Sequence, residues 1–181
     1  MTNLFREEMA QRAETYTQSR KLTLYCQYPL GAGIDGCVST AVGLALSAPD
    51  RPAYAVLGDL TFLHDSGGLL IGPREPRPDL TLVVANDDGG GIFTTLEPGD
   101  ASLSQDFERL FGTPTGTELG ALCRAHGIRH EVVSSAAALE SAIATRPDGL
   151  RVIEVPLDRA THRGERQRIA LRDQPARRHA G

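Results

Sequence analysis

Two acidic, glycine-containing turns are the parts of this 181-residue sequence best suited to chemistry. Gly58-Asp59 follows the apolar run 53–57, and the turn 86–89, Asn-Asp-Asp-Gly, follows the apolar run 80–85. Carboxyl ends of neighbouring parallel strands meet at one sheet edge, where ligands bind. Carboxylate and carbonyl oxygens suit Mg²⁺ shared with a phosphate, and glycines let backbone N–H groups approach phosphate oxygens. The pair predicts a diphosphate held through a divalent metal, although each turn taken singly is more simply a structural turn.

These turns need a sheet to bring them together, and the rest of the chain predicts one. Apolar runs indicate strands, and helical spacing with caps and glycine stops indicates helices. Their alternation predicts an α/β domain, a parallel sheet with helices on both faces and right-handed crossovers. The expected strands are 22–25, 53–57, 80–85, 129–133 and 150–155; the expected helices are 3–19, 35–46 (capped by Asp35), 64–70, 103–111, 118–126 and 135–144 (capped by Ser134 or Ser135).

Composition limits the classes of protein. With 40% hydrophobic residues, 23% charged residues and a net charge of −4, the chain fits one globular domain and not a disordered or disulfide-rich chain. Three cysteines without a C-x-x-C pair argue against a zinc site. The same cysteine pattern predicts a reducing, cytoplasmic compartment. The polar first 20 residues and the lack of a long apolar run predict no signal peptide and no membrane span. The arginine-rich segment 158–181 lacks interleaved aromatics, so we expect a solvated helix and no nucleic-acid partner.

Longer motifs narrow the function further. The runs GIDG at 33–36, STAVG at 39–43, GDLTFLHD at 58–65 and VANDDGGGIF at 84–93 resemble the MenD family of thiamin-diphosphate-dependent synthases of menaquinone biosynthesis. FGTP at 111–114 and Asp158-Arg159 continue the likeness, which covers about 31–168. It reaches only the C-terminal, diphosphate-binding (PP-type) domain of that family. The family decarboxylates 2-oxoglutarate and joins the remaining fragment to isochorismate.

The resemblance implies roles for individual residues. The Mg²⁺ (or Mn²⁺) ligands would be the side chains of Asp59 and Asp87, the latter often Asn in the family, and the Gly89 carbonyl. Phe93 and Leu96 would lie near the substrate, and Ile34 under the thiazolium ring of the cofactor. The full set of implied cofactor-binding residues is Ile34, Gly58, Asp59, Leu60, Thr61, Asn86, Asp87, Gly89, Gly90, Ile92 and Phe93.

The sequence also departs from the family. No catalytic residue is expected here, because the activating glutamate belongs to an N-terminal pyrimidine-binding domain for which 181 residues leave no room. At 28–30, Tyr-Pro-Leu stands where the family has an Asn-Arg-Gly segment whose arginine binds substrate carboxylate. We therefore divide the chain into a divergent segment 1–30, a diphosphate-binding domain 31–157, and a basic helix and tail 158–181.

Two hypotheses follow. The chain is either the diphosphate-binding part of a MenD-type enzyme, inactive without a pyrimidine-binding domain, or a truncated remnant or binding module; a domain of another thiamin-diphosphate carboligase is a weaker reading. An exposed apolar patch at Ile34, Ile92, Phe93 and Leu96 would favour a homo-oligomer or a partner chain. Other candidates have simpler roles: Asp65 caps a helix, Cys37 fills space in the core, Ser39 and Thr40 pack a helix, and His126 and His130 lie on the surface.

Overall fold

The computed structural model describes residues 23–25, 33–99 and 104–172, and within them it has a five-stranded parallel sheet of order β1-β2-β3-β5-β4. The prediction of a parallel α/β sheet is confirmed, and each described strand lies within about two residues of its expected bounds. The strands are β1 (Thr23–Tyr25), β2 (Ala53–Gly58), β3 (Leu80–Asn86), β4 (Arg129–Val132) and β5 (Leu150–Pro156).

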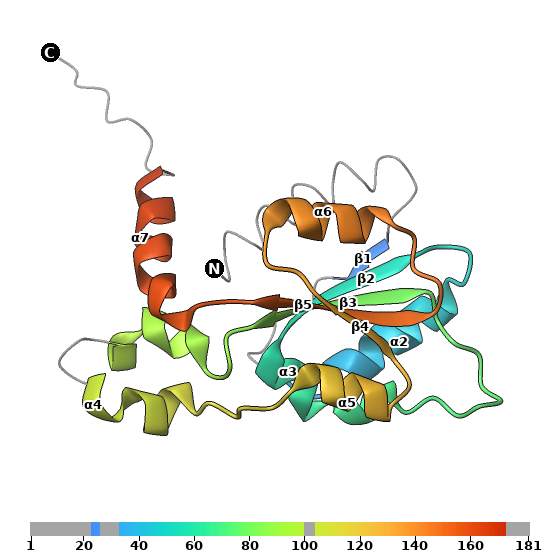
Figure 1. The fold of residues 1–181 in the computed structure, drawn as a ribbon, viewed down its shortest axis with the longest axis horizontal. Coiled ribbons are helices and arrows are strands. Elements are labelled where there is room, and N and C mark those ends of the chain that lie inside the picture. Colours follow the sequence, from blue (N-terminus) through green and yellow to red (C-terminus); the bar gives the residue numbers. More distant parts are fainter. Residues whose placement is uncertain (1–22, 26–32, 100–103, 173–181) are drawn as a thin grey trace, which may run out of the picture.

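Helices cover both faces of the sheet (Figure 1). Helices α2 (Cys37–Ser47), α3 (Asp59–His64) and α5 (Leu119–Ala125) lie on one face, and α6 (Ala136–Ala144) lies on the other. Side chains of a strand alternate between the faces, and both faces of the central strands are packed here. Leu82, Val84 and Val152 join the larger apolar cluster, while Val83 and Ile153 join the smaller one beneath α6. The central strands are buried on both sides, which is why they read as continuous apolar runs.

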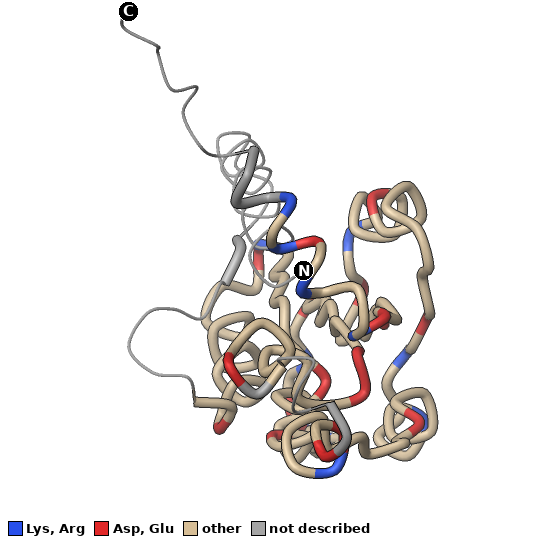
Figure 2. The backbone as a smooth tube through the Cα atoms, turned by 90° about the vertical axis from the view of Figure 1, so that its left-hand side faces the viewer, with Lys and Arg blue, Asp and Glu red and all other residues tan. Residues whose placement is uncertain are grey.

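Short helical segments gather beyond the carboxyl ends of β3 and β5 (Figure 1). Helix α7 (His162–Arg172), expected to be solvated, is exposed at residues 163, 164 and 166–168 but contacts the fold near its start: His162 is buried, and the guanidinium of Arg166 donates to Thr95 Oγ1 at 2.7 Å. Basic residues recur along the described part of α7 (Figure 2). The segments beyond those strand ends are η2 (Gly91–Thr95), η3 (Glu97–Gly99), α4 (Ser104–Phe107), the π-helical η5 (Glu108–Gly112) and η6 (Arg159–Thr161), whereas η1 (Ser66–Leu69) follows α3 and contacts α2.

Two sequence predictions about helix ends are wrong. An α-helix begins at Asp59, directly after β2, instead of at residue 64, because Gly58 ends the strand in an extended conformation and the chain turns at once into the helix. The residue that precedes α2 is Gly36, with φ 69°, and not Asp35. The first turn of α2 is capped instead by Asp65, which lies 26 residues beyond Ser39 in the sequence. The Asp65 carboxylate accepts from Ser39 N at 2.7 Å and from Ser39 Oγ at 2.9 Å.

Other local predictions are confirmed. Ser135 caps α6 by accepting from Ala138 N, and Cys37 is buried in the core. The helix expected over 3–19 and the residues after 172 lie outside the described part of the chain. In that described part, no helix is both long enough and apolar enough to cross a membrane.

Asp65→Ala tests the distant cap. The change removes the acceptor for two hydrogen bonds at the first turn of α2, so we expect the free energy of unfolding to fall by about 1 kcal/mol. Urea denaturation followed by circular dichroism measures this loss. Asp50→Ala, at an exposed turn, serves as the control; equal stability of the two variants would contradict the capping role.

Candidate functional site

The two acidic turns lie side by side at the carboxyl edge of the sheet. Strands β2 and β3 pair in parallel, with Gly58 opposite Ala85, so Asp59 and Asn86 leave the sheet at neighbouring positions. The backbone N–H of Gly89 donates to Asp59 Oδ2 at 2.7 Å and joins one turn to the other. The sheet thus brings together Asp59, Asp87 and Gly89, the three groups predicted to bind a metal.

The Asp59 carboxyl is buried, and no cationic side chain in the described part of the chain forms an ion pair with it. Its side chain is 3% exposed, and burial, together with the nearby charge of Asp87, raises its pKa from 3.8 to about 6. Burial likewise raises the pKa of Asp87, against the opposing effect of the Arg159 guanidinium. Burial disfavours ionisation of both carboxylates, and the charge of Asp87 disfavours that of Asp59 further, so the site gains from a divalent cation.

Asp87 also has an unused acceptor atom. Its Oδ1 is buried and accepts no hydrogen bond from any described residue. His162 Nδ1 lies 3.6 Å from the other carboxylate oxygen, but burial lowers the pKa of His162, which favours the neutral ring. The open oxygen and the uncompensated charge fit a Mg²⁺ or Mn²⁺ ligand.

The three glycines after the acidic turn serve close packing. A Cβ at Gly89 or Gly90 would overlap the backbone carbonyls of Gly112 and Phe111, and one at Gly91 would overlap the Asp87 carboxylate. The sequence predicted that glycine N–H groups here approach a phosphate. In this structure the N–H of Gly89 donates to Asp59 Oδ2 and that of Gly90 to Gly112 O at 2.8 Å, and the approach to a phosphate stays a prediction.

Asn86 supports the turn from behind. Its side-chain oxygen accepts from Asp88 N at 3.0 Å, and its amide donates to Glu154 Oε1 at 2.7 Å. The other Glu154 oxygen lies 2.7 Å from His130 Nε2 on the edge strand β4. The prediction of a surface His130 is therefore wrong: only 15% of its side chain is exposed, because Glu154 holds it against the sheet.

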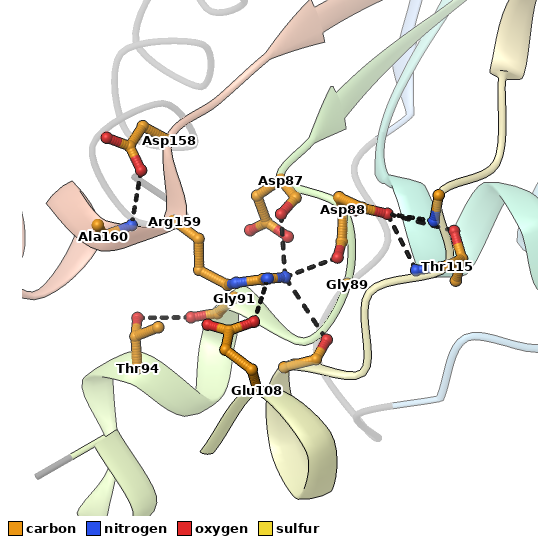
Figure 3. Close-up of polar contacts among 12 residues, drawn as sticks. Asp87, Asp88, Gly89, Gly91, Thr94, Glu108, Thr115, Asp158, Arg159 and Ala160 are labelled. Atoms are coloured by element: carbon orange, nitrogen blue, oxygen red, sulfur yellow. Dashed lines mark hydrogen bonds and ion pairs between the residues drawn. The ribbon is translucent and has the colours of Figure 1, made fainter. Parts of the chain in front are cut away.

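Arg159, which sequence reasoning did not assign to the site, contacts the acidic turn directly (Figure 3). One guanidinium nitrogen, Nη1, donates to the carbonyls of Asp87 at 3.1 Å and Asp88 at 2.6 Å. The Asp88 carboxylate faces away and accepts from the backbone N–H groups of Thr115 and Gly116. The only sequence signal for Arg159 was the Asp-Arg pair that extends the family resemblance.

The remaining predicted residues lie at the start of α3, before α2 and after the acidic turn 86–89. Gly58, Leu60 and Thr61 form the junction of β2 and α3. The four apolar residues expected to form a patch are all exposed; the Phe93 ring also lies 5.8 Å from the Phe111 ring. Their exposed fractions are Ile34 37%, Ile92 47%, Phe93 37% and Leu96 46%.

Comparison with known families decides the identity of this fold. Residues 9–155 match the family described as "Thiamine pyrophosphate enzyme, C-terminal TPP binding domain". The chain belongs to this family. Thiamine pyrophosphate is thiamin diphosphate, so the thiamin-diphosphate-binding domain implied by the family resemblance is confirmed.

Curated relatives of this TPP-binding domain are synthases with the full name 2-succinyl-5-enolpyruvyl-6-hydroxy-3-cyclohexene-1-carboxylate synthase, which is MenD. The Saccharopolyspora erythraea protein is 59% identical over 138 residues, covering 76% of this chain and 24% of the relative. The Nocardia farcinica protein is 59% identical over 133 residues, covering 73% and 24%. The resemblance to the C-terminal domain of MenD is confirmed, and the chain spans about a quarter of the length of these relatives.

Solved structures share the fold. A thiamine diphosphate-dependent 4-hydroxybenzoylformate decarboxylase of Rhodococcus jostii RHA1 has a TM-score of 0.51 at 22% identity, covering 65% of this chain and 22% of that one. A benzoylformate decarboxylase from Polynucleobacter necessarius has a TM-score of 0.50 at 24% identity, covering 72% and 24%. At such identities the likeness establishes the architecture of the TPP-binding domain.

Asp59→Asn tests the buried charge in the metal-free chain. Because the pKa of Asp59 rises from 3.8 to about 6 on folding, the free energy of unfolding falls as pH rises through this window. The asparagine side chain keeps an oxygen that accepts from Gly89 N–H but carries no charge. The stability of the variant therefore does not fall as pH rises through this window. Relative to wild type, we expect it to gain about 2 kcal/mol between pH 4 and pH 7.

Urea denaturation in EDTA at each pH measures the difference. Asp50→Asn, at an exposed position, is the matched control and should follow wild type throughout. If the advantage of Asp59→Asn stays constant from pH 4 to pH 7, the Asp59 carboxyl is not the strained buried charge described here.

Proposed function

We propose that this TPP-binding domain holds thiamin diphosphate through Mg²⁺ or Mn²⁺ at the carboxyl edge of β2 and β3. The metal ligands are the side chains of Asp59 and Asp87 and the carbonyl of Gly89. The observation that carries the proposal is the pair of buried carboxylates, one of which has an open oxygen, in a domain of this family. When bound, the cofactor supplies the electron sink for decarboxylation of a 2-oxo acid, and the metal anchors its diphosphate.

The chain's own residues would bind and orient the cofactor. Gly58, Leu60 and Thr61 present the start of α3 to the diphosphate. The exposed apolar residues have a different task, since they would shield the reacting end from water. In this assignment Ile34, Ile92 and Phe93 contact the cofactor, and Phe93 and Leu96 face the substrate; Asn86 acts by holding the turn through Asp88.

The reaction we propose is that of MenD: decarboxylation of 2-oxoglutarate and addition of the remaining fragment to isochorismate, in cytoplasmic menaquinone biosynthesis. High identity to MenD relatives supports it. The described residues include no group assigned to proton transfer on the cofactor, so activity needs a pyrimidine-binding domain from a partner chain or a longer polypeptide. The exposed side chains of Ile34, Ile92, Phe93 and Leu96 support such a partner or a homo-oligomer, because exposed apolar surface commonly marks a site that another protein covers.

A non-catalytic remnant or binding module that keeps the fold is the second candidate. A domain of another thiamin-diphosphate carboligase is the third and weaker candidate, because GDLT at 58–61 and GGGIF at 89–93 favour MenD. A neighbouring reading frame that encodes a pyrimidine-binding domain with its glutamate would favour the synthase over the remnant.

Calorimetric titration of thiamin diphosphate into the chain tests the proposed site. We expect binding in Mg²⁺ and none in EDTA, because two carboxylates would repel the diphosphate without a bridging cation. Asp59→Ala removes one ligand and should abolish the binding. Asp50→Ala, which changes the same net charge at an exposed turn, should bind like wild type.

Two outcomes would contradict the proposal. Equal binding in Mg²⁺ and EDTA would exclude a metal bridge. No binding by the wild-type chain in either would mean that this domain does not form a working diphosphate site, and the remnant would become the better reading.

A further inference from the structure

The turn that carries the proposed metal ligands has an unusual backbone. Asp88 has φ 55°, in the left-handed region that non-glycine residues seldom adopt, and Gly89 follows with φ 137°. This path directs the Gly89 N–H to Asp59. Such a conformation persists only where surrounding contacts hold it, so the contacts of Asp88 decide where Gly89 lies.

Arg159 makes those contacts on the carbonyl side (Figure 3). Its Nη1 lies within hydrogen-bond distance of three carbonyl oxygens: Asp87 at 3.1 Å, Asp88 at 2.6 Å and Gly112 at 3.5 Å. Its Nη2 donates to Glu108 Oε2, which fixes the plane of the guanidinium from the other side. The arginine side chain is 14% exposed, so water competes little for these contacts.

The backbone that carries Arg159 is also held in place. Asp158 accepts from Ala160 N at 2.9 Å and caps the short helix η6 that follows β5. The Gly112 carbonyl that approaches Arg159 also accepts from Gly90 N at 2.8 Å. The guanidinium therefore joins three segments far apart in sequence: the turn after β3, the end of η5 and the start of η6.

We propose that Arg159 is a positioning residue for the metal-binding turn, holding Asp88 in its left-handed conformation through the forked contacts of its guanidinium. This inference rests on the proposed function, because it concerns the placement of Gly89 for the metal. Without Arg159, the carbonyls of Asp87 and Asp88 lose their shared donor. The turn then relaxes, and Gly89 moves away from Asp59.

The planar, forked shape of the Arg159 guanidinium, and not its charge alone, lets it position the metal-binding turn. A guanidinium presents several donors in one rigid plane, so it reaches the turn and Glu108 together, whereas an ammonium is a compact point charge on a flexible stem. Arg159→Lys keeps the charge beside the turn and loses the fork. The lysine variant therefore separates positioning from simple electrostatic attraction.

Hydrogen exchange of backbone amides in the metal-free full chain, in EDTA, measures the turn directly. We expect Arg159→Lys and Arg159→Gln to speed exchange of the Gly89 and Gly90 amides at least tenfold. The core amides of Val83 and Val152 should exchange as in wild type. Arg166→Gln, which alters an exposed arginine contact on α7, is the matched control and should stay within twofold at every amide.

A second variant tests whether the backbone of Asp88 is the element being held. Asparagine tolerates the left-handed region better than most residues and keeps the oxygen that accepts from Thr115 and Gly116. Asp88→Asn added to Arg159→Lys should slow Gly89 exchange again by at least threefold.

Binding is measured on the same proteins by titrating thiamin diphosphate in Mg²⁺. Arg159→Lys should weaken binding at least tenfold, while Arg166→Gln stays within twofold of wild type. If Gly89 in Arg159→Lys exchanges like wild type, the positioning role is overturned whatever the binding result. A rise in exchange that includes the core amides would overturn a local role.

The two proposals fail in different ways. Fast Gly89 exchange in Arg159→Lys, with no binding of cofactor by wild type, would overturn the proposed function and leave the positioning of the turn supported. Normal binding by wild type together with normal binding by Arg159→Lys would support the function and overturn the positioning role.

Discussion

The burial of two carboxylates at one edge of the sheet is the constraint on which the rest of this structure depends. Asp59 begins α3 and Asp87 lies in the turn after β3, and burial raises the pKa of both. Ionised carboxylates in such a place are costly unless a cation or several donors compensate them. Within the described residues the compensation is incomplete, because Asp87 retains an open oxygen.

The surrounding elements hold the two carboxylates close together. Parallel pairing of β2 and β3 sets the two turns at the same level, and an apolar core on both faces of the sheet fixes that register. Three consecutive glycines allow the second turn to pack against the end of η5. Asn86 and Arg159 then hold the backbone of the turn from opposite sides.

Much of this could be read from the sequence, for physical reasons. Buried parallel strands leave apolar runs, and the ends of such strands meet at one edge, so the pairing of Gly58-Asp59 with the turn 86–89 followed from position alone. The helix start at Asp59 was missed because glycine and aspartate in tandem also indicate a loop. Asp35 was assigned as a cap because it precedes α2 in sequence, whereas the actual cap, Asp65, comes from a segment beyond the next strand.

The residues that were not foreseen share one property: their role arises from contacts across the chain. Arg159 reaches a turn more than 70 residues earlier, and Glu154 links Asn86 on β3 with His130 on β4. No local pattern distinguishes such an arginine or glutamate from the many charged residues on the surface. His162 was likewise assigned to a solvated helix, although it is buried beside Asp87.

The most direct test of the central claim is a crystal structure of the chain grown with Mn²⁺ and thiamin diphosphate, with the metal located by its anomalous scattering. The account predicts one strong peak at the carboxyl edge of β2 and β3, bound by Asp59, Asp87 and the Gly89 carbonyl and by the diphosphate. A cofactor bound there with the metal elsewhere, or a metal that leaves the Asp87 carboxylate untouched, would contradict it.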